Sequence, residues 1–291
     1  EILIGLVGSE MCIRDSYMSK GYVPLREQYD NSVSHALEYY IADFALSRFA
    51  EALGKKKDAE MFYKRSLGYK HYYSKEFGTF RPILPDGTFY SPFNPRQGEN
   101  FEPNPGFHEG SAWNYSFYVP HDVYGLAKLM GGKNPFIKKL QMVFDEGLYD
   151  PANEPDIAYA HLFSYFRGEE WRTQKETQRL LDKYFTTKPN GIPGNDDTGT
   201  MSAWAIFNMI GFYPDCPGLP EYTLTTPVFN KVTIRLDPKW YKEKELVIES
   251  NRTQPGTLYI NKVLLNGKKF NQYRITHDEL VHSQRILFDL K

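Results

Sequence analysis

Three polar motifs place carboxylates beside aromatic residues and could carry out chemistry together. They are FHEGSAWNYSFYVPHD at 107–122, NEPDIAYAHLFSYF at 153–166 and GIPGNDDTGTMSAW at 191–204. Their acids Glu109, Glu154 and Asp197 are separated by 45 and 43 positions, about the length of two helices with their turn and loop. In a ring of stacked helical hairpins, that period returns each loop to the same rim. Acids that are distant in the sequence would then meet in one cleft.

A pair of carboxylates across a cleft is the usual equipment for hydrolysing a glycosidic bond. One acid protonates the leaving oxygen, and the other activates water or attacks the carbon. Glu109 follows Phe107 and His108 and precedes Ala112-Trp113, and partial desolvation by such neighbours favours the protonated form that an acid needs. Asp197 lies in a glycine-flanked loop that can stay hydrated and ionised, as a base requires.

The sequence alone is also compatible with structural roles, rather than catalytic ones, for these acids. Acids near helix starts most often cap backbone N–H groups, and Asn195, Asp196 and Asp197 precede an expected helix. Glu109, beside Gly and Ser, could simply close a turn. The pair His121-Asp122 could form a dyad, but a helix-starting Asp preceded by an orienting His is the commoner explanation.

The same residues could also form a metal site. Asn and Glu oxygens are ligands that Ca²⁺ accepts, whereas the chain lacks the clustered His and Cys residues of a zinc site. Asn153-Glu154-Pro155 could equally be a capped turn.

Amphipathic helices must position these motifs. The clearest runs over residues 35–53, with Leu37, Tyr40, Ile41 and Phe44 on one face and Gly54 as the stop. Further helices are expected at 58–73, at 114–130, from the cap pair Asn134-Pro135 to about 147, and at 157–166, 173–185 and 200–210. The long intervening loops at 78–107 and 186–199 are of a kind that is more often functional than idle.

After Pro214 the pattern changes to period-two, β-branched segments. Strands are expected at 222–226, 231–236, 245–249, 257–265 and 285–290, with a tight turn at Asn266-Gly267. The predicted fold class is therefore mainly α with a small antiparallel β segment at the C-terminus.

Composition argues against charged polymers as partners. The 35 Lys and Arg residues nearly balance 36 Asp and Glu residues, so no footprint for nucleic acid is visible. No apolar run approaches the length of a membrane span. The 22 Tyr, 20 Phe and 4 Trp residues suit carbohydrate ligands or a large aromatic core. Two cysteines exclude a disulfide framework.

Residues 1–16, EILIGLVGSEMCIRDS, are predicted to be a non-native segment, because residues 6–16 resemble the translation of a sequencing adapter. The expected domains are then 1–16 as this segment, 17–221 as a helical part and 222–291 as a β-rich part. The native sequence is expected to begin near Tyr17 as a truncated reading frame.

The three acidic motifs, in their order and spacing, resemble the signature blocks of glycoside hydrolase family 92, the calcium-dependent exo-α-mannosidases. GYVPLREQYDNSVSHALEYYIADFAL is similar to the family's Ser-rich start of a helix, and TTPVFNKVTIRL resembles the start of its C-terminal β segment. The resemblance covers residues 21–291. It implies that 17–221 is the later part of an (α/α)6 catalytic barrel, an incomplete toroid of helical hairpins, and that an N-terminal β-sandwich domain is missing.

The implied activity is inverting hydrolysis of terminal α-mannose from glycans, including N-glycans, assisted by Ca²⁺. The resemblance places the general acid on Glu109 and the general base on Asp197, and it places Asn153 and Glu154 in the block associated with the metal. The same motifs supply the predicted substrate-binding residues, which are Trp113, His108, Asp196 and Asn195. The family implies a periplasmic or extracellular location, and a fragment of this kind could be inactive alone.

Two other classes of function stay open on the sequence. One is a non-catalytic, carbohydrate-binding helical toroid, which is favoured if Glu109 and Asp197 do not face one cleft. The other is a different (α/α)-barrel glycosidase or a polysaccharide lyase. A lyase would need a Tyr/His or Arg constellation in place of the acid pair.

Overall fold

The computed structural model describes residues 13–26, 31–98, 104–254 and 256–291, and the chain divides into two compact units. Unit 1 comprises residues 1–150 and 217–219, and unit 2 comprises 151–216 and 220–291. Most of the segment predicted to be non-native lies outside the described residues. Residues 13–20 are helical, and Tyr17 in this helix donates a hydrogen bond of 2.5 Å to Asp43.

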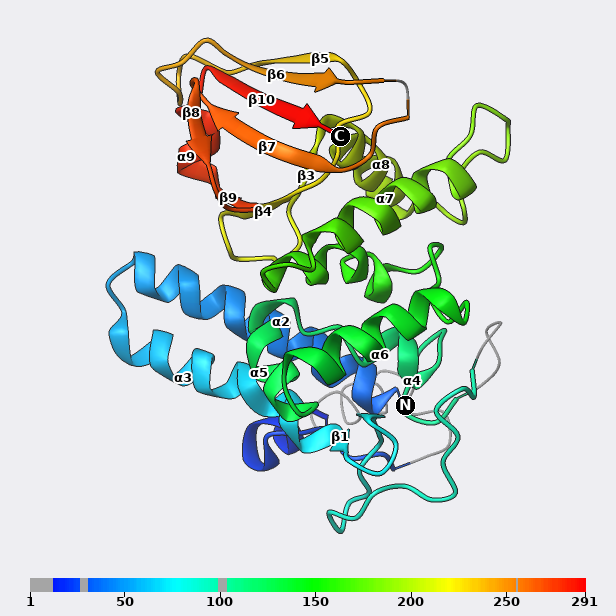
Figure 1. The fold of residues 1–291 in the computed structure, drawn as a ribbon. Coiled ribbons are helices and arrows are strands. Elements are labelled where there is room, and N and C mark those ends of the chain that lie inside the picture. The colour runs from blue at the N-terminus through cyan, green and yellow to red at the C-terminus, as the bar shows by residue number, and fades with distance from the viewer. Residues whose placement is uncertain (1–12, 27–30, 99–103, 255) are drawn as a thin grey trace. The chain divides into compact units, whose positions relative to one another are not determined.

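Unit 1 is built on a helical hairpin of α2 (Ser32–Ala52) and α3 (Lys56–Ser66), which lie side by side in Figure 1. Gly54, with φ of 72°, turns the chain between them, as its position in the sequence predicts. The predicted second helix instead begins at Lys56 and tightens into the 3₁₀ helix η1 (Leu67–Tyr72). The short strands β1 (Tyr73–Ser74) and β2 (Thr79–Phe80) follow.

The prediction of one continuous helix over 114–130 is wrong. The segment is broken into α4 (Ala112–Tyr115), the 3₁₀ helix η3 (Pro120–Asp122) and α5 (Val123–Leu129). Pro120 explains the break, because it lacks an N–H and pushes Val119, with φ of −136°, out of the helical region. Asp122 then caps α5 by accepting from the Gly125 N–H at 2.9 Å. The ring of His121 bonds the carbonyl of Ser66 at 2.9 Å, so this pair has the structural role.

Helix α6 (Lys133–Asp145) completes the helices of unit 1. Its N-cap residue is Gly132, with φ of 109°, so the predicted cap pair Asn134-Pro135 lies inside the first turn. Proline is well tolerated there, since the first N–H groups of a helix have no partner within it.

In unit 2 the first two helical segments are 3₁₀ helices, η4 (Glu154–Asp156) and η5 (Tyr159–Tyr165). Helix α7 (Glu170–Tyr184), the 3₁₀ turn η6 (Asp197–Gly199) and helix α8 (Thr200–Ile210) follow. The predicted helices at 173–185 and 200–210 are thus confirmed. The segment predicted as a helix at 157–166 is helical, but most of it forms the 3₁₀ helix η5 and not an α-helix.

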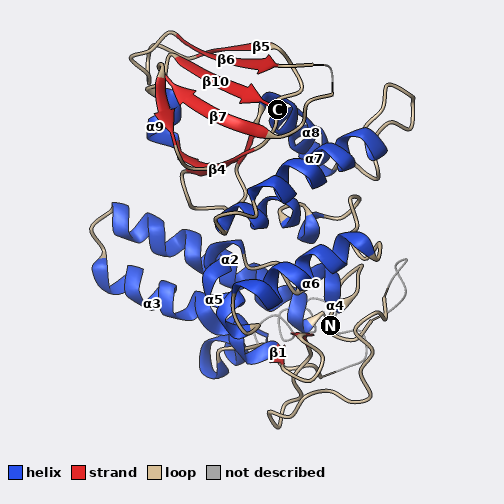
Figure 2. Ribbon diagram, viewed as in Figure 1, coloured by secondary structure: helices blue, strands red, loops and turns tan. Residues whose placement is uncertain are grey.

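Two sheets and helix α9 (His277–Val281) form the rest of unit 2, and Figure 2 shows its strands in red. The three-stranded sheet has the order β3 (Phe212–Tyr213), β4 (Glu221–Leu224), β9 (Arg274–Thr276). The five-stranded sheet has the order β5 (Lys231–Arg235), β6 (Glu245–Arg252), β10 (Arg285–Leu290), β7 (Ile260–Leu265), β8 (Lys268–Phe270).

The larger sheet is mixed, so the prediction of an antiparallel segment is corrected for one pair. Strand β10 runs parallel to β6 and antiparallel to β7. The final strand, β10, lies between β6 and β7, which precede it in the sequence. A pattern of alternating apolar residues does not predict such a position. Alternate residues of these strands, such as Ile248 and Phe288, are 1% exposed and form one apolar core with the second sheet.

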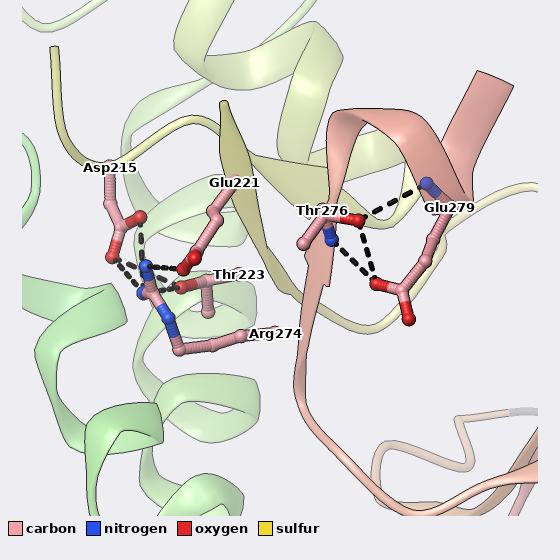
Figure 3. Close-up of polar contacts among 6 residues, drawn as sticks. All are labelled: Asp215, Glu221, Thr223, Arg274, Thr276 and Glu279. Carbon is pink, nitrogen blue, oxygen red and sulfur yellow. Dashed lines mark hydrogen bonds and ion pairs between the residues drawn. The ribbon is translucent and has the colours of Figure 1, made fainter. Parts of the chain in front are cut away.

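A buried ion-pair cluster joins the segment after β3 to the small sheet (Figure 3). Arg274 on β9 contacts Asp215 at 2.9 Å, Glu221 at 3.0 Å and the Thr223 hydroxyl at 3.0 Å. Its guanidinium also lies 3.9 Å from the ring centre of Tyr165. Burial alone would lower the pKa of Arg274, but the charges of Asp215 and Glu221 and the Glu221 hydrogen bond outweigh it and raise the pKa.

Within the described ranges, no helix combines the length and the apolar character that crossing a membrane requires.

Candidate active site

Glu109 lies in unit 1, in the turn that leads into α4. Its backbone has φ of 49°, in the left-handed region that non-glycine residues rarely adopt. This conformation costs roughly 1–2 kcal/mol for an L-residue. The carboxylate is 54% exposed, and its Oε1 lies 3.5 Å from Nε2 of His108. The turn therefore presents the side chain outward at an energetic cost.

The aromatic residues that flank Glu109 in the sequence differ from it in exposure. Phe107 is 2% and Trp113 8% exposed, so both are buried in the core of unit 1 while Glu109 stays exposed. Ser111 and Asn114 form a capping box at the start of α4 and fix Trp113 in the first turn. The partly apolar environment expected for the Glu109 carboxylate stays a prediction.

Asp197 lies in unit 2, in the turn η6 that leads into α8, and it is exposed as expected for a base. Its carbonyl accepts hydrogen bonds from the hydroxyls of Thr198 at 2.8 Å and Thr200 at 2.7 Å. Thr198 has φ of 53° and Gly199 has φ of 81°, so two consecutive residues after Asp197 are left-handed. For the β-branched Thr198 this backbone is a strained outlier.

The capping role that the sequence left open for three residues belongs to Asp196. Its Oδ1 accepts from the N–H groups of Met201 at 2.9 Å and Ser202 at 3.0 Å, and its Oδ2 accepts from the Ser202 hydroxyl at 2.5 Å. The hydrogen bonds from the side chain and backbone of Ser202 lower the pKa of Asp196. The neighbouring Asn195 is exposed.

Replacing Asp196 by Ala should lower the melting temperature, because α8 loses its cap. The folded-state pKa of Asp196 is lowered, so its contribution is present above about pH 4 and is lost as the pH falls through the folded value. The difference in Tm between wild type and Asp196→Ala should therefore be largest near neutral pH and shrink as the pH falls below about 4. A difference that stays constant across this range, or that also appears with Asn195→Ala, would contradict the assignment.

Backbone strain coincides with the two predicted acids. Among the described residues, the non-glycine positions with positive φ are Glu109, Thr198 and Asn266. Asn266 belongs to the Asn-Gly turn between β7 and β8, where this conformation is ordinary. The other two positions are one predicted acid and the residue that follows the other. Such strain is typical of functional sites, where it persists because the surroundings hold it.

Asn153 and Glu154, the predicted metal residues, start the 3₁₀ helix η4. The Asn153 Oδ1 accepts from the Glu154 N–H at 3.0 Å, and the Glu154 side chain is exposed. Ca²⁺ takes six to eight oxygen ligands. Across the residues described, no group of three His, Cys, Asp or Glu side chains is placed to hold a metal ion. The role of Asn153 and Glu154 in binding a metal stays a prediction.

The structure brings His108 next to Glu109 and shows Asp196 and Asp197 in one turn. Glu109 belongs to unit 1, and Asp197 and Glu154 belong to unit 2. Their meeting in one cleft stays a prediction.

The chain is similar to known proteins over nearly its whole length. A profile of the Glycosyl hydrolase family 92 catalytic domain matches residues 8–291. A family GH92 α-mannosidase from Bacteroides thetaiotaomicron, solved in complex with mannoimidazole, has a TM-score of 0.87 and 30% identity over 95% of this chain and 38% of its own. A GH92 inverting mannosidase from the same species has a TM-score of 0.85 and 31% identity over 95% of this chain and 39% of its own.

A curated relative from Arthroderma benhamiae, described as an uncharacterized secreted glycosidase, is 26% identical over 90% of this chain and 37% of its own length. The chain thus spans between 37% and 39% of the length of these relatives. Because the family profile covers residues 8–291, the chain belongs to glycoside hydrolase family 92.

Proposed function

We propose that the protein carrying this chain is an exo-acting α-mannosidase that inverts the configuration of the released sugar. The observation that carries this proposal is the coincidence of family membership with strained turns at the two predicted acids. The mannosidases named among its relatives, one of them described as inverting, support the substrate and the stereochemistry. The described helical hairpin is compatible with part of an (α/α)6 toroid, and an N-terminal β-sandwich would complete the protein.

In this proposal Glu109 donates a proton to the glycosidic oxygen as the bond to the anomeric carbon breaks. Asp197 accepts a proton from the water that attacks the same carbon from the opposite face. Inversion requires the two carboxyl groups to stand about 6.5–9.5 Å apart, so that the water fits between them. The exposure of both carboxylates leaves them accessible to a sugar and to water.

The predicted substrate-binding residues differ in what their side chains already contact. His108 is 59% exposed and Asn195 is exposed, so both can reach a sugar hydroxyl. Trp113 is buried, and the Asp196 carboxylate caps α8. We therefore propose direct sugar contacts for His108 and Asn195, whereas Trp113 and Asp196 act through the turns they stabilise.

Incubating this protein with an α-linked mannose oligosaccharide tests the function. The proposal expects free mannose to be released from the non-reducing end, detected by chromatography. Binding of the oligosaccharide without release would instead support a non-catalytic carbohydrate-binding toroid. Release of an unsaturated sugar would support a lyase.

Activity should depend on Ca²⁺, with Asn153 and Glu154 contributing ligands. Treatment with EDTA is expected to abolish mannose release, and Ca²⁺ should restore it better than Mg²⁺, which demands a tighter octahedral site. Full activity after exhaustive EDTA treatment and dialysis would reject the role of the metal and leave the acid pair unaffected. The secreted relative supports a periplasmic or extracellular location for this chain.

A further inference from the structure

Side chains bond four backbone polar groups of residues that flank Glu109 on both sides. On the carbonyl side, the hydroxyl of Tyr115 donates to the His108 carbonyl at 2.6 Å, and the side-chain amide of Asn104 donates to the Gly110 carbonyl at 3.0 Å. The donors on the backbone are also bonded. The His108 N–H donates to the Ser34 hydroxyl at 2.9 Å, and the Ser111 N–H donates to the Asn114 side chain at 2.8 Å.

These four side chains are buried, although the Glu109 carboxylate is exposed. Tyr115 is 4%, Ser34 5%, Asn114 6% and Asn104 7% exposed. Hydrogen bonds that are shielded from water hold their geometry, since no solvent competes for the donors. The position of Ser34 is itself fixed, because the N–H groups of Val33 and Ser34 at the start of α2 donate to the Gly106 carbonyl. The turn around Glu109 is thus tied to two helices.

This frame explains how Glu109 can stay left-handed. A non-glycine residue keeps this conformation only where the surrounding structure holds the backbone on both sides of it. Tyr115 bonds the peptide that joins His108 to Glu109, and Asn104 bonds the peptide that joins Gly110 to Ser111, one residue beyond Glu109. The direction of the carboxylate therefore depends on two side chains that bond the backbone on either side of it.

We propose that Tyr115 and Asn104 are positioning residues that aim the Glu109 carboxylate at the glycosidic oxygen, an inference that rests on the proposed function. Proton transfer to a leaving group is sensitive to placement, because an error of about 1 Å can cost on the order of 10²-fold in rate. Loss of one frame bond should therefore weaken acid catalysis and leave substrate binding largely intact.

The test compares Tyr115→Phe with wild type on two substrates of the protein that carries this chain. One is an α-mannose disaccharide, whose leaving group needs a proton, and the other is 2,4-dinitrophenyl α-mannoside, whose leaving group departs without one. Tyr115→Phe should lower kcat on the disaccharide about tenfold with KM within about twofold, and change kcat on the dinitrophenyl substrate by less than about twofold. Tyr118→Phe, which removes a hydroxyl bonded to Glu38 at 2.8 Å, should behave as wild type on both substrates.

The possible outcomes distinguish failure of the positioning role from failure of the proposed function. Equal losses on both substrates, or no loss on the disaccharide, would overturn the positioning role while the mannosidase function stands. A wild-type protein that cleaves neither substrate would overturn the proposed function and the positioning role with it. If Tyr115→Phe fails to fold, Ser34→Ala removes a bond from the same frame at the His108 N–H, and the same selective loss is expected.

Discussion

Replacing Glu109 by Gln should lower kcat on an unactivated α-mannoside by about 10²–10⁴-fold, the usual contribution of a general acid. Gln has nearly the shape of Glu and can occupy the same turn, but its amide cannot donate the proton that the leaving oxygen needs. The loss should nearly vanish on 2,4-dinitrophenyl α-mannoside, because that leaving group is stable as an anion. Steady-state kinetics on the two substrates measure both effects.

The matched control is Glu51→Gln, at an exposed carboxylate on α2 that pairs with Arg48 at 2.8 Å. It changes the net charge in the same way and should leave kcat and KM within about twofold, since exposed ion pairs contribute little. Wild-type kcat in Glu109→Gln on the disaccharide would remove Glu109 from the chemistry. A similar loss on both substrates would indicate that the substitution disturbs the fold of the turn.

Replacing Asp215 by Ala should destabilise unit 2 by about 3–5 kcal/mol, the usual cost of removing one partner from a buried ion pair. The Asp215 side chain is fully buried and the Arg274 side chain is 16% exposed, so the remaining guanidinium would lose its closest anion inside the protein (Figure 3). A loss of this size is a large part of the 5–15 kcal/mol that typically holds a domain together. Hydrogen exchange of the amides in β4 and β9 should therefore accelerate strongly.

Two further variants separate burial from charge. Glu221 also pairs with Arg274 but is 36% exposed, so Glu221→Gln should cost far less than Asp215→Ala. The double variant Asp215→Leu and Arg274→Met removes both charges and should recover much of the lost protection, because paired apolar residues can replace a buried ion pair. Unchanged exchange in Asp215→Ala would show that the cluster does not stabilise the small sheet.

The sequence predicts those parts of the fold that depend on local patterns. Helix α2 is confirmed because its apolar spacing and the glycine that ends it are both local signals. Helix α8 and most strands are confirmed for the same reason. The break at Pro120 was also readable, because proline disfavours helix in the residue before it, and the expected helix over 114–130 ignored that signal.

Other features depend on partners that are remote in the sequence. Strand β10 pairs with β6 in parallel across 32 residues of intervening chain, which no alternating pattern specifies. The frame around Glu109 likewise uses Ser34, whose bond to His108 spans 74 positions. Tyr115 and Asn104 were missed because a tyrosine or asparagine in an aromatic, polar segment carries no signal of its hydrogen-bond acceptor. Backbone strain at Thr198 was also invisible, since Thr rarely adopts a positive φ.

The most direct measurement of the proposed acid and base is the configuration of the first sugar released. Proton NMR of the wild-type protein acting on an aryl α-mannoside resolves the two anomers of mannose before they interconvert. If Glu109 protonates the leaving group while Asp197 activates water on the opposite face, β-mannose should appear first and α-mannose only later. First release of α-mannose, or no release of mannose, would contradict this account.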